Sequence, residues 1–346
     1  MEFKSDLELL NDFVLIRNLK EITKKSYKTS LNLYTDFNNE KFLDLIIEAE
    51  MEETNKIRWK NRKLKQRLIK FRNFLTVNYR KNYAKTTFSR IVTLYRHYDI
   101  EVHDLPAQSS KNFNESPPIT YNDLPDKSII KKALRKSDSQ MKAIILFMAS
   151  SGCARRETLN LTISDFINAT GEYHNSNEIE EVLKTLKNKR KVIPTFKMKR
   201  QKTNKYYFTF CTPEATKAII NHLSERNNLK SSSKIFTIHP ESLSRKFIKI
   251  NSELKLGKSG TYNRFRSHNL RKFHASNLKN DGMLIEDINS MQGKSRNITD
   301  EAYFFENPET LKKKYLSHIN AVIIYDKNKI RPNNSAKVMF QKSENT

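Results

Sequence analysis

The chain contains little cysteine and glycine and has no long apolar run. Its two cysteines, Cys153 and Cys211, are too few for a disulfide scaffold and suit a reducing compartment. No paired Cys/His spacing supports a zinc site, and no Gly-rich loop ends in GK[ST], so we predict no metal and no cofactor. No stretch reaches the roughly 18 apolar residues of a membrane-spanning helix. The acidic start, residues 1–13, lacks the pattern of a signal peptide, so we expect a cytoplasmic protein without a membrane partner.

Positive charge is what the sequence has in excess. Lysine and arginine number 64 against 38 acidic residues, which gives a net charge of +26 and a pI of about 9.8. Such a surplus is the electrostatic footprint of a nucleic-acid-binding protein. A protein adapted to a salty cytoplasm, or one that binds an anionic membrane surface, would share it. The length of 346 residues favours two domains.

Residues 1–102 are predicted to form a helical domain that binds DNA. Apolar residues recur there at three-to-four spacing, with helices expected at about 40–50, 53–80 and 85–98. Residues 56–72 hold nine lysines or arginines and no acid, while an apolar stripe persists. A face of this kind can follow DNA phosphates, although a solvated basic surface would look the same. The residues predicted to contact DNA are Arg58, Lys60, Arg62, Lys63, Lys65, Arg67, Lys85 and Arg90.

A change in composition marks the domain boundary. Residues 103–122 are rich in Ser, Asn and Pro without an apolar period, which is typical of a linker. We expect a second domain at 123–325 and a polar tail at 326–346. The predicted fold class is mainly α with a small antiparallel sheet. Its expected elements are a buried helix at 141–150 that stops at Gly152, a β-hairpin within 191–212, and helices at 213–223, 242–251 and 308–324.

Residues with phosphate chemistry gather near the end of the second domain. His268 and Arg271 are three apart on a predicted helix, so they share one face that can hold phosphate oxygens. Gly293-Lys294 and Tyr303 follow, and a tyrosine hydroxyl can act as a covalent nucleophile. Far upstream, Lys202 lies at the turn of the predicted hairpin and would project from it.

In order, these segments resemble the catalytic domain of the tyrosine recombinases, the phage-type integrase family, over residues 145–324. The layout is most similar to integrases of archaeal, especially methanogen, proviruses. Tyr303 lies nine residues after Lys294, which matches the family spacing. The segments that carry the resemblance are Ser151-Gly152 through Arg155 to Glu157-Thr-Leu-Asn-Leu, Arg200-Gln-Lys202-Thr-Asn-Lys-Tyr-Tyr, His268-Asn-Leu-Arg271, Met291-Gln-Gly293-Lys294 and Tyr303.

The resemblance implies a recombinase that integrates and excises a mobile element. It implies a core-binding domain and a catalytic domain that clamp duplex DNA, and assembly into a tetramer through the C-terminal helix and tail. Neither metal nor nucleotide is needed in that family. The implied roles are nucleophile for Tyr303, which forms a 3′-phosphotyrosyl link, general acid for Lys202, and binding of the scissile phosphate for Arg155, Arg271, His268 and Lys294.

Two positions depart from the family pattern. The usual first arginine would fall at Ala154, and arginine occurs one and two residues later, at Arg155 and Arg156. We expect Arg155 to take the role, with Arg156 as the alternative and loss of catalysis as a further one. Lys294 stands where the family has His or Trp, and lysine can still donate to a phosphate oxygen.

Other readings of the same residues stay open. His274 lies on the same predicted helix as Arg271 and could touch DNA, although a histidine on a helix face is more often structural. Tyr315 is a rival nucleophile within an amphipathic pattern. A type IB topoisomerase, a chromosome-dimer resolvase and a DNA-binding protein without catalysis are the alternative functions.

Overall fold

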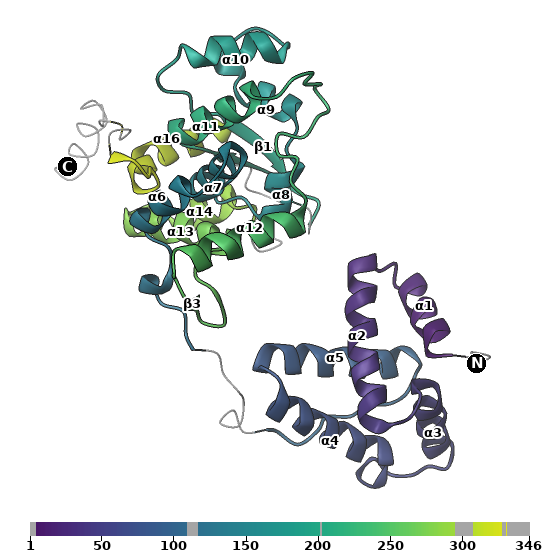
Figure 1. The fold of residues 1–346 in the computed structure, drawn as a ribbon. Coiled ribbons are helices and arrows are strands. Elements are labelled where there is room, and N and C mark those ends of the chain that lie inside the picture. Colours follow the sequence, from purple (N-terminus) through teal and green to yellow (C-terminus); the bar gives the residue numbers. More distant parts are fainter. Residues whose placement is uncertain (1–4, 109–116, 201–202, 295–306, 327–329, 331–346) are drawn as a thin grey trace, which may run out of the picture. The chain divides into compact units, whose positions relative to one another are not determined.

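The computed structural model divides into two compact units, Met1–Pro117 and Pro118–Thr346, called here the N-terminal and C-terminal units. Each has its own apolar core. None of the helices in the described part of the chain is long and apolar enough to cross a membrane. Figure 1 shows both units. The residues that the structure describes are 5–108, 117–200, 203–294, 307–326 and 330.

The N-terminal unit is built from helices around an aromatic core. The hydroxyls of Tyr34 and Tyr95 lie 3.1 Å apart in that core, so each buried phenol has a polar partner. The carboxylate of Asp6 accepts the backbone N–H of Phe42 at 3.0 Å and of Leu43 at 2.9 Å, which ties the first helix to the start of the third. The elements are α1 (Asp6–Ile16), α2 (Glu21–Asn38), α3 (Phe42–Thr54), η1 (Trp59–Asn61), α4 (Lys63–Asn78) and α5 (Lys81–His97).

The long helix expected at 53–80 is wrong, because α3 and α4 are separate helices. Lys56 has φ of +55°, a left-handed conformation that ends the helical path after α3. A new helix then starts at Lys63, whose backbone N–H donates to the carboxylate of Glu52 at 2.6 Å. The apolar stripe continued across this break, so periodicity alone did not reveal it.

Helix α7 (Ser139–Ser151) lies at the centre of the C-terminal unit and packs against both α11 and α13 (Figure 1). Its side chains from Ala143 to Ser151 are buried, as its continuous apolar sequence predicted. The carboxylate of Asp138 caps the helix by accepting the N–H of Met141 at 2.8 Å. Gly152 ends it at φ of +67°.

Two hairpins interrupt the helices of this unit. In the first, β1 (Thr195–Lys199) pairs antiparallel with β2 (Tyr206–Phe210), which confirms the predicted hairpin. In the second, β3 (Lys258–Ser259) pairs with β4 (Tyr262–Asn263), and its short strands lacked a periodic signal in the sequence. The mainly helical class with a small antiparallel sheet is confirmed.

The remaining helices surround this centre. Helix α13 carries the residues singled out in the sequence, and α14 and α16 lie against β2. The helices of this unit other than α7 are η3 (Tyr121–Asp123), α6 (Lys127–Arg135), α8 (Arg155–Asn160), α9 (Ile163–Ala169), η4 (Gly171–Tyr173), α10 (Ile179–Lys187), α11 (Pro213–Ser224), α12 (Pro240–Glu253), α13 (Ser267–Asn280), α14 (Ile285–Met291), α16 (Pro308–His318) and η5 (Ile319–Ala321), as far as the structure describes the chain.

The C-terminal helix α16 packs on the core of its own chain. Leu311 and Tyr315 are buried there, and the Tyr315 hydroxyl donates to the carbonyl of Ser150 at 2.8 Å. Beyond the helix, the carboxylate of Glu214 accepts the N–H of Ile324 at 2.5 Å. The apolar face of α16 is therefore covered within the chain. The expected helix at 308–324 ends early, at His318, and continues as η5.

Candidate active site

Arg271 is the buried centre of the candidate site. It lies on α13 with only 9% of its surface exposed. One guanidinium nitrogen donates to the carbonyl of Gly152 at 2.6 Å and the other to the carbonyl of Gln292 at 2.7 Å. Each of these nitrogens carries a second hydrogen, so the fork keeps donors for another acceptor. Arg271 therefore joins the end of α7 to the turn after α14.

His268 lies one turn before Arg271, and the pair confirms the helical spacing read from the sequence. It is exposed and belongs to the first turn of α13, where helix N-termini favour anions. Partial burial lowers the pKa of His268, and the positive charges of Arg266, Lys272, Arg271 and Lys294 lower it further. The lowered pKa favours the neutral imidazole at neutral pH.

The first arginine segment begins where α7 ends. Ala154 is the N-cap of α8, and its N–H donates to the carboxylate of Glu157 at 3.0 Å. Arg155 is exposed and donates to the hydroxyl of Ser244 at 2.5 Å. Arg156 is also exposed. Because Arg155 follows Gly152 by three residues, its Cα lies within about 11 Å of the glycine that binds Arg271.

A second arginine, Arg200, reaches the same turn from the β1–β2 hairpin. One of its guanidinium nitrogens donates to the carbonyl of Gln292 at 3.0 Å and also to the carbonyl of Gly293. Next in sequence is Lys294, whose pKa is lowered by partial burial and by the charges of Arg271 and Arg200. The sequence had placed Arg200 within a motif without giving it a role.

The cations of this cluster lack ion pairs within the described residues, although the charge of Glu157 acts on Arg271. Among the described residues, Arg271, Arg200 and Lys294 form no ion pair with a carboxylate. Like charges that lie together, and that lower one another's pKa, are stabilised by an anion of several oxygens. The arrangement can bind a phosphate group and stabilise extra negative charge on it. No group of three or more His, Cys, Asp or Glu within the described ranges could hold a metal ion.

Two sequence alternatives acquire structural roles. His274 is fully buried beside Gly152, and its Nδ1 lies 3.1 Å from the side-chain nitrogen of Gln292. Burial, with Arg271 and Lys294, lowers its pKa to about 3. Tyr315 is fully buried, and burial raises the pKa of its hydroxyl well above the ordinary value. Neither side chain can reach a DNA strand without unfolding its surroundings.

Two residues of the predicted site lie outside the described ones. In the sequence, Lys202 follows Arg200 by two positions, between the residues of β1 and β2, and Tyr303 follows Lys294 by nine. The structure describes Arg200 and Lys294, the residues that directly precede these two undescribed segments. The roles of Lys202 and Tyr303 stay predictions.

Several cations of the predicted DNA-binding face are bound within the N-terminal unit. Arg62 is buried and pairs with Glu53 at 2.7 Å, and Lys63 pairs with Glu48 at 2.8 Å. Arg67 pairs with Glu40 at 3.1 Å and with Glu48 at 3.0 Å. The sequence run itself contains no acid. Its partners Glu48 and Glu53 come from α3, and Glu40 comes from the turn between α2 and α3, which a local pattern could not show.

The remaining residues of the predicted DNA-binding face differ in how far they are exposed to solvent. Arg90 is half-buried, donates to the hydroxyl of Ser30 at 3.3 Å and stacks over the ring of Tyr27. Arg58, Lys60 and Lys85 are exposed, and Lys65 is half-buried. Arg58 and Lys60 are the better candidates for phosphate contacts, because both are exposed to solvent and a phosphate can approach them.

Comparison with known proteins identifies the fold. No protein-family model and no curated protein sequence matches the chain. Among solved structures, a λ integrase (75–356) dimer bound to a COC′ core site is similar with a TM-score of 0.54 and 10% identity, covering 88% of this chain and 98% of that one. A XerH recombinase in a post-cleavage complex with a palindromic difH substrate gives 0.50 and 15%, covering 86% and 80%. The chain has the fold of tyrosine recombinases and integrases.

Proposed function

We propose that this protein is a site-specific DNA recombinase that cleaves and rejoins strands through a covalent 3′-phosphotyrosyl intermediate. The observation that carries the proposal is the cluster of Arg271, Arg200 and Lys294, which form no ion pair with a carboxylate among the described residues and lie near His268. It stands on a fold that known tyrosine recombinases share. The similar λ integrase and XerH structures are bound to DNA substrates. The net charge of +26 supports DNA as the partner here too.

The reaction begins when the hydroxyl oxygen of Tyr303 attacks the scissile phosphorus and its proton passes to water. An ordinary tyrosine has a pKa of about 10, so the attack needs a site that stabilises the charge it creates. Extra negative charge develops on the non-bridging oxygens. Arg271, Arg155, His268 and Lys294 donate to those oxygens, and one such donor typically accounts for about 2.7–4 kcal/mol of the barrier.

The leaving strand departs as the new bond forms. The bond from phosphorus to the 5′ oxygen breaks, and Lys202 donates a proton to that oxygen as general acid. The 3′ phosphate stays on Tyr303. A 5′ hydroxyl from a partner strand then attacks the phosphorus, returns a proton to Lys202 and releases the tyrosine, whose oxygen takes up a proton from water. Each step exchanges one phosphodiester bond for another, and no residue in this scheme requires a metal or nucleotide.

The finer biological role rests on the sequence resemblance. The protein would integrate and excise an archaeal, methanogen-type provirus or similar element, acting on DNA in the cytoplasm of the host. Two attachment sites imply four protomers, and we propose a DNA-dependent tetramer. Since the apolar face of α16 is covered by its own chain, the contact to a neighbour would use the outer face of that helix or the predicted tail, residues 326–346.

A two-site assay tests the proposed function. Plasmids carrying two copies of a selected site are incubated with the protein, and products are read as exchanged flanking sequence. Exchange that needs both sites supports the recombinase. Relaxation of a supercoiled plasmid that lacks any site would favour a type IB topoisomerase. Binding without any strand cleavage would contradict both enzymes.

A further inference from the structure

The β1–β2 hairpin contacts the Gln292-Gly293 turn at two separate points. The first is Arg200, whose guanidinium donates to the carbonyls of Gln292, at 3.0 Å, and Gly293. The second is Tyr207. A Cβ built on Gly293 would lie 2.5 Å from a ring carbon of Tyr207, so the ring rests against the glycine backbone. Two contacts of different chemistry fix both the distance and the rotation of the hairpin against the turn.

The hairpin holds these two contacts in a constant relation to each other. Met198 pairs with Tyr207 across the strands, and Arg200 follows Met198 by two residues, so Arg200 and Tyr207 lie on one face. The turn is closed by the N–H of Arg200, which donates to the carbonyl of Lys205 at 2.8 Å, and by the N–H of Asn204, which donates back to Arg200 at 2.8 Å. A shift at one contact therefore moves the other.

Tyr207 also ties the hairpin to the first arginine segment. Its hydroxyl donates to Oε2 of Glu157 at 2.9 Å, and this carboxylate oxygen also accepts the N–H of Ala154 at 3.0 Å. Burial raises the pKa of Tyr207 far above its ordinary value, which keeps the hydroxyl a donor. The hairpin thus touches the segments that carry Arg155 on one side and Lys294 on the other.

We propose that Arg200 is a positioning residue, which sets the register of the β1–β2 hairpin against the Gln292-Gly293 turn and so aims the hairpin's general acid at the leaving oxygen. This inference rests on the proposed function. Arg200 acts through the hairpin because its hydrogen bonds go to main-chain carbonyls. A misplacement of about 1 Å in such an element can cost about 10²-fold in rate.

The test compares two leaving groups. One nicked duplex has the natural bridging 5′ oxygen at the cleavage position, and the other has sulfur there, which leaves without a proton. Arg200→Met keeps the side-chain stem and removes the donors. We expect it to cleave the oxygen substrate about 10²-fold more slowly than wild type, and to cleave the sulfur substrate at nearly the wild-type rate. Lys199→Met, which removes a neighbouring exposed cation, should leave both rates unchanged.

The outcomes distinguish a failure of the positioning role from a failure of the proposed function. A slow Arg200→Met that sulfur does not rescue would overturn the positioning role, as would a variant with normal rates. Rescue by an uncharged methylphosphonate instead would show that Arg200 contacts the phosphate itself, which also overturns it. Lys202→Ala is the reference for loss of the general acid, and its failure to be rescued would overturn that assignment in the proposed function. A wild-type protein that cleaves neither duplex would overturn the proposed function and the positioning role together.

Arg200→Lys guards against a folding defect. It keeps the charge but cannot reach both carbonyls with a planar fork, so we expect an intermediate defect that sulfur again removes. Thermal unfolding of both variants is measured alongside the rates. If Arg200→Met does not fold, a folded Arg200→Lys with equal defects on both substrates would still overturn the inference.

Discussion

Gly293 is a single residue on which several contacts of the site depend. Its φ of +58° favours glycine, and an added methyl group would meet the Tyr207 ring at 2.5 Å. We expect Gly293→Ala to lower strand cleavage at least as much as loss of one phosphate donor, about 10²-fold. Gly171→Ala is the matched control, because nothing lies within 4 Å of its added Cβ. Single-turnover cleavage measures both. Equal rates for the two variants would contradict the proposed packing.

His274 makes the stability of the C-terminal unit depend on pH. Its pKa is about 3 in the folded protein, below the ordinary value of 6.5, so the unfolded chain binds the proton more tightly. The stabilisation is complete above pH 6.5 and is lost as the pH falls toward 3. Between pH 7 and pH 5 the loss amounts to about 2 kcal/mol.

A variant isolates this histidine from the others. Denaturant unfolding of wild type and His274→Gln is compared at pH 7 and pH 5, and we expect the variant to lack most of the drop. The remaining histidines are common to both proteins and cancel in the comparison. A drop of the same size in both would show that His274 is protonated in the folded state.

Arg155 and Arg156 can be told apart at the residue scale. Both are exposed at the start of α8, and Arg155 faces Ser244 on α12. If Arg155 binds the scissile phosphate, Arg155→Ala lowers the cleavage rate about 10²–10³-fold, whereas Arg156→Ala has a small effect. A methylphosphonate substrate, which lacks one charge, should reduce the defect of Arg155→Ala. The reverse ranking of the two variants would assign the role to Arg156.

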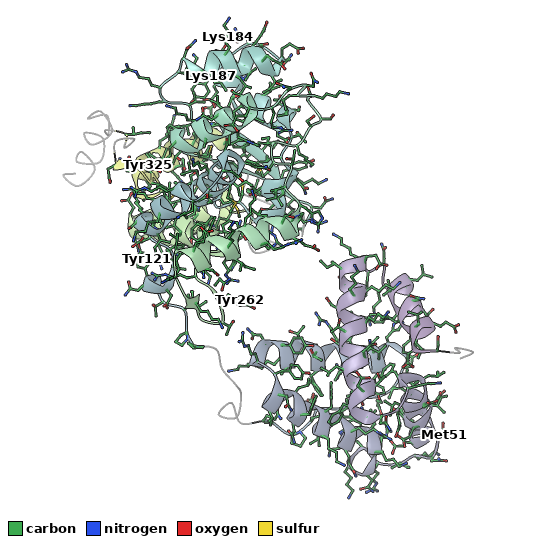
Figure 2. All side chains as sticks on the ribbon, in the orientation of Figure 1. Met51, Tyr121, Lys184, Lys187, Tyr262 and Tyr325 are labelled. Atoms are coloured by element: carbon green, nitrogen blue, oxygen red, sulfur yellow. The ribbon has the colours of Figure 1, made fainter. Side chains whose placement is uncertain are left out.

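At the scale of elements, the basic face of the N-terminal unit contains cations held in ion pairs, such as Arg62 and Arg67, and exposed cations such as Arg58 and Lys60. We expect Arg58→Gln with Lys60→Gln to lower the slope of log affinity against log salt by about 1.8, or 0.9 for each phosphate contact. Lys184→Gln with Lys187→Gln removes the same charge from exposed residues of α10 (Figure 2) and should leave the slope unchanged. Equal changes in both double variants would indicate only an effect of net charge.

The same elements show how far sequence alone could lead. The helix α7 and its Gly152 end were predicted closely, because a continuous apolar run that stops at a glycine has few other solutions. The hairpin was predicted because two β-prone runs flank a polar turn. The β3–β4 hairpin and the break at Lys56 were not, since two-residue strands and a left-handed lysine leave no periodic signal.

The sequence motifs of the candidate site could be predicted, whereas the tertiary contacts between them could not. His268 and Arg271 follow from helical spacing, which is local. Arg200, Tyr207 and Gln292 meet only through tertiary packing, and no pattern in one sequence joins residues 200 and 292. The acidic partners of Arg62 and Arg67 were missed for the same reason.

At the scale of the whole molecule, the chain combines two separately packed cores with one excess of positive charge. The N-terminal core is rich in aromatic rings, and the C-terminal core is organised around α7. The proposed chemistry resides in the C-terminal unit, where Arg271 connects α7, α13 and the turn after α14.

The central claim is that this molecule becomes covalently linked to DNA through Tyr303. The protein is incubated with a pool of nicked duplexes randomised around the nick, denatured, digested with protease and nuclease, and its peptides are identified by mass spectrometry. The account predicts a nucleotide attached by its 3′ phosphate to the Tyr303 peptide, and no adduct in Tyr303→Phe. An adduct on another residue such as Tyr315, or no adduct from wild type, would contradict it.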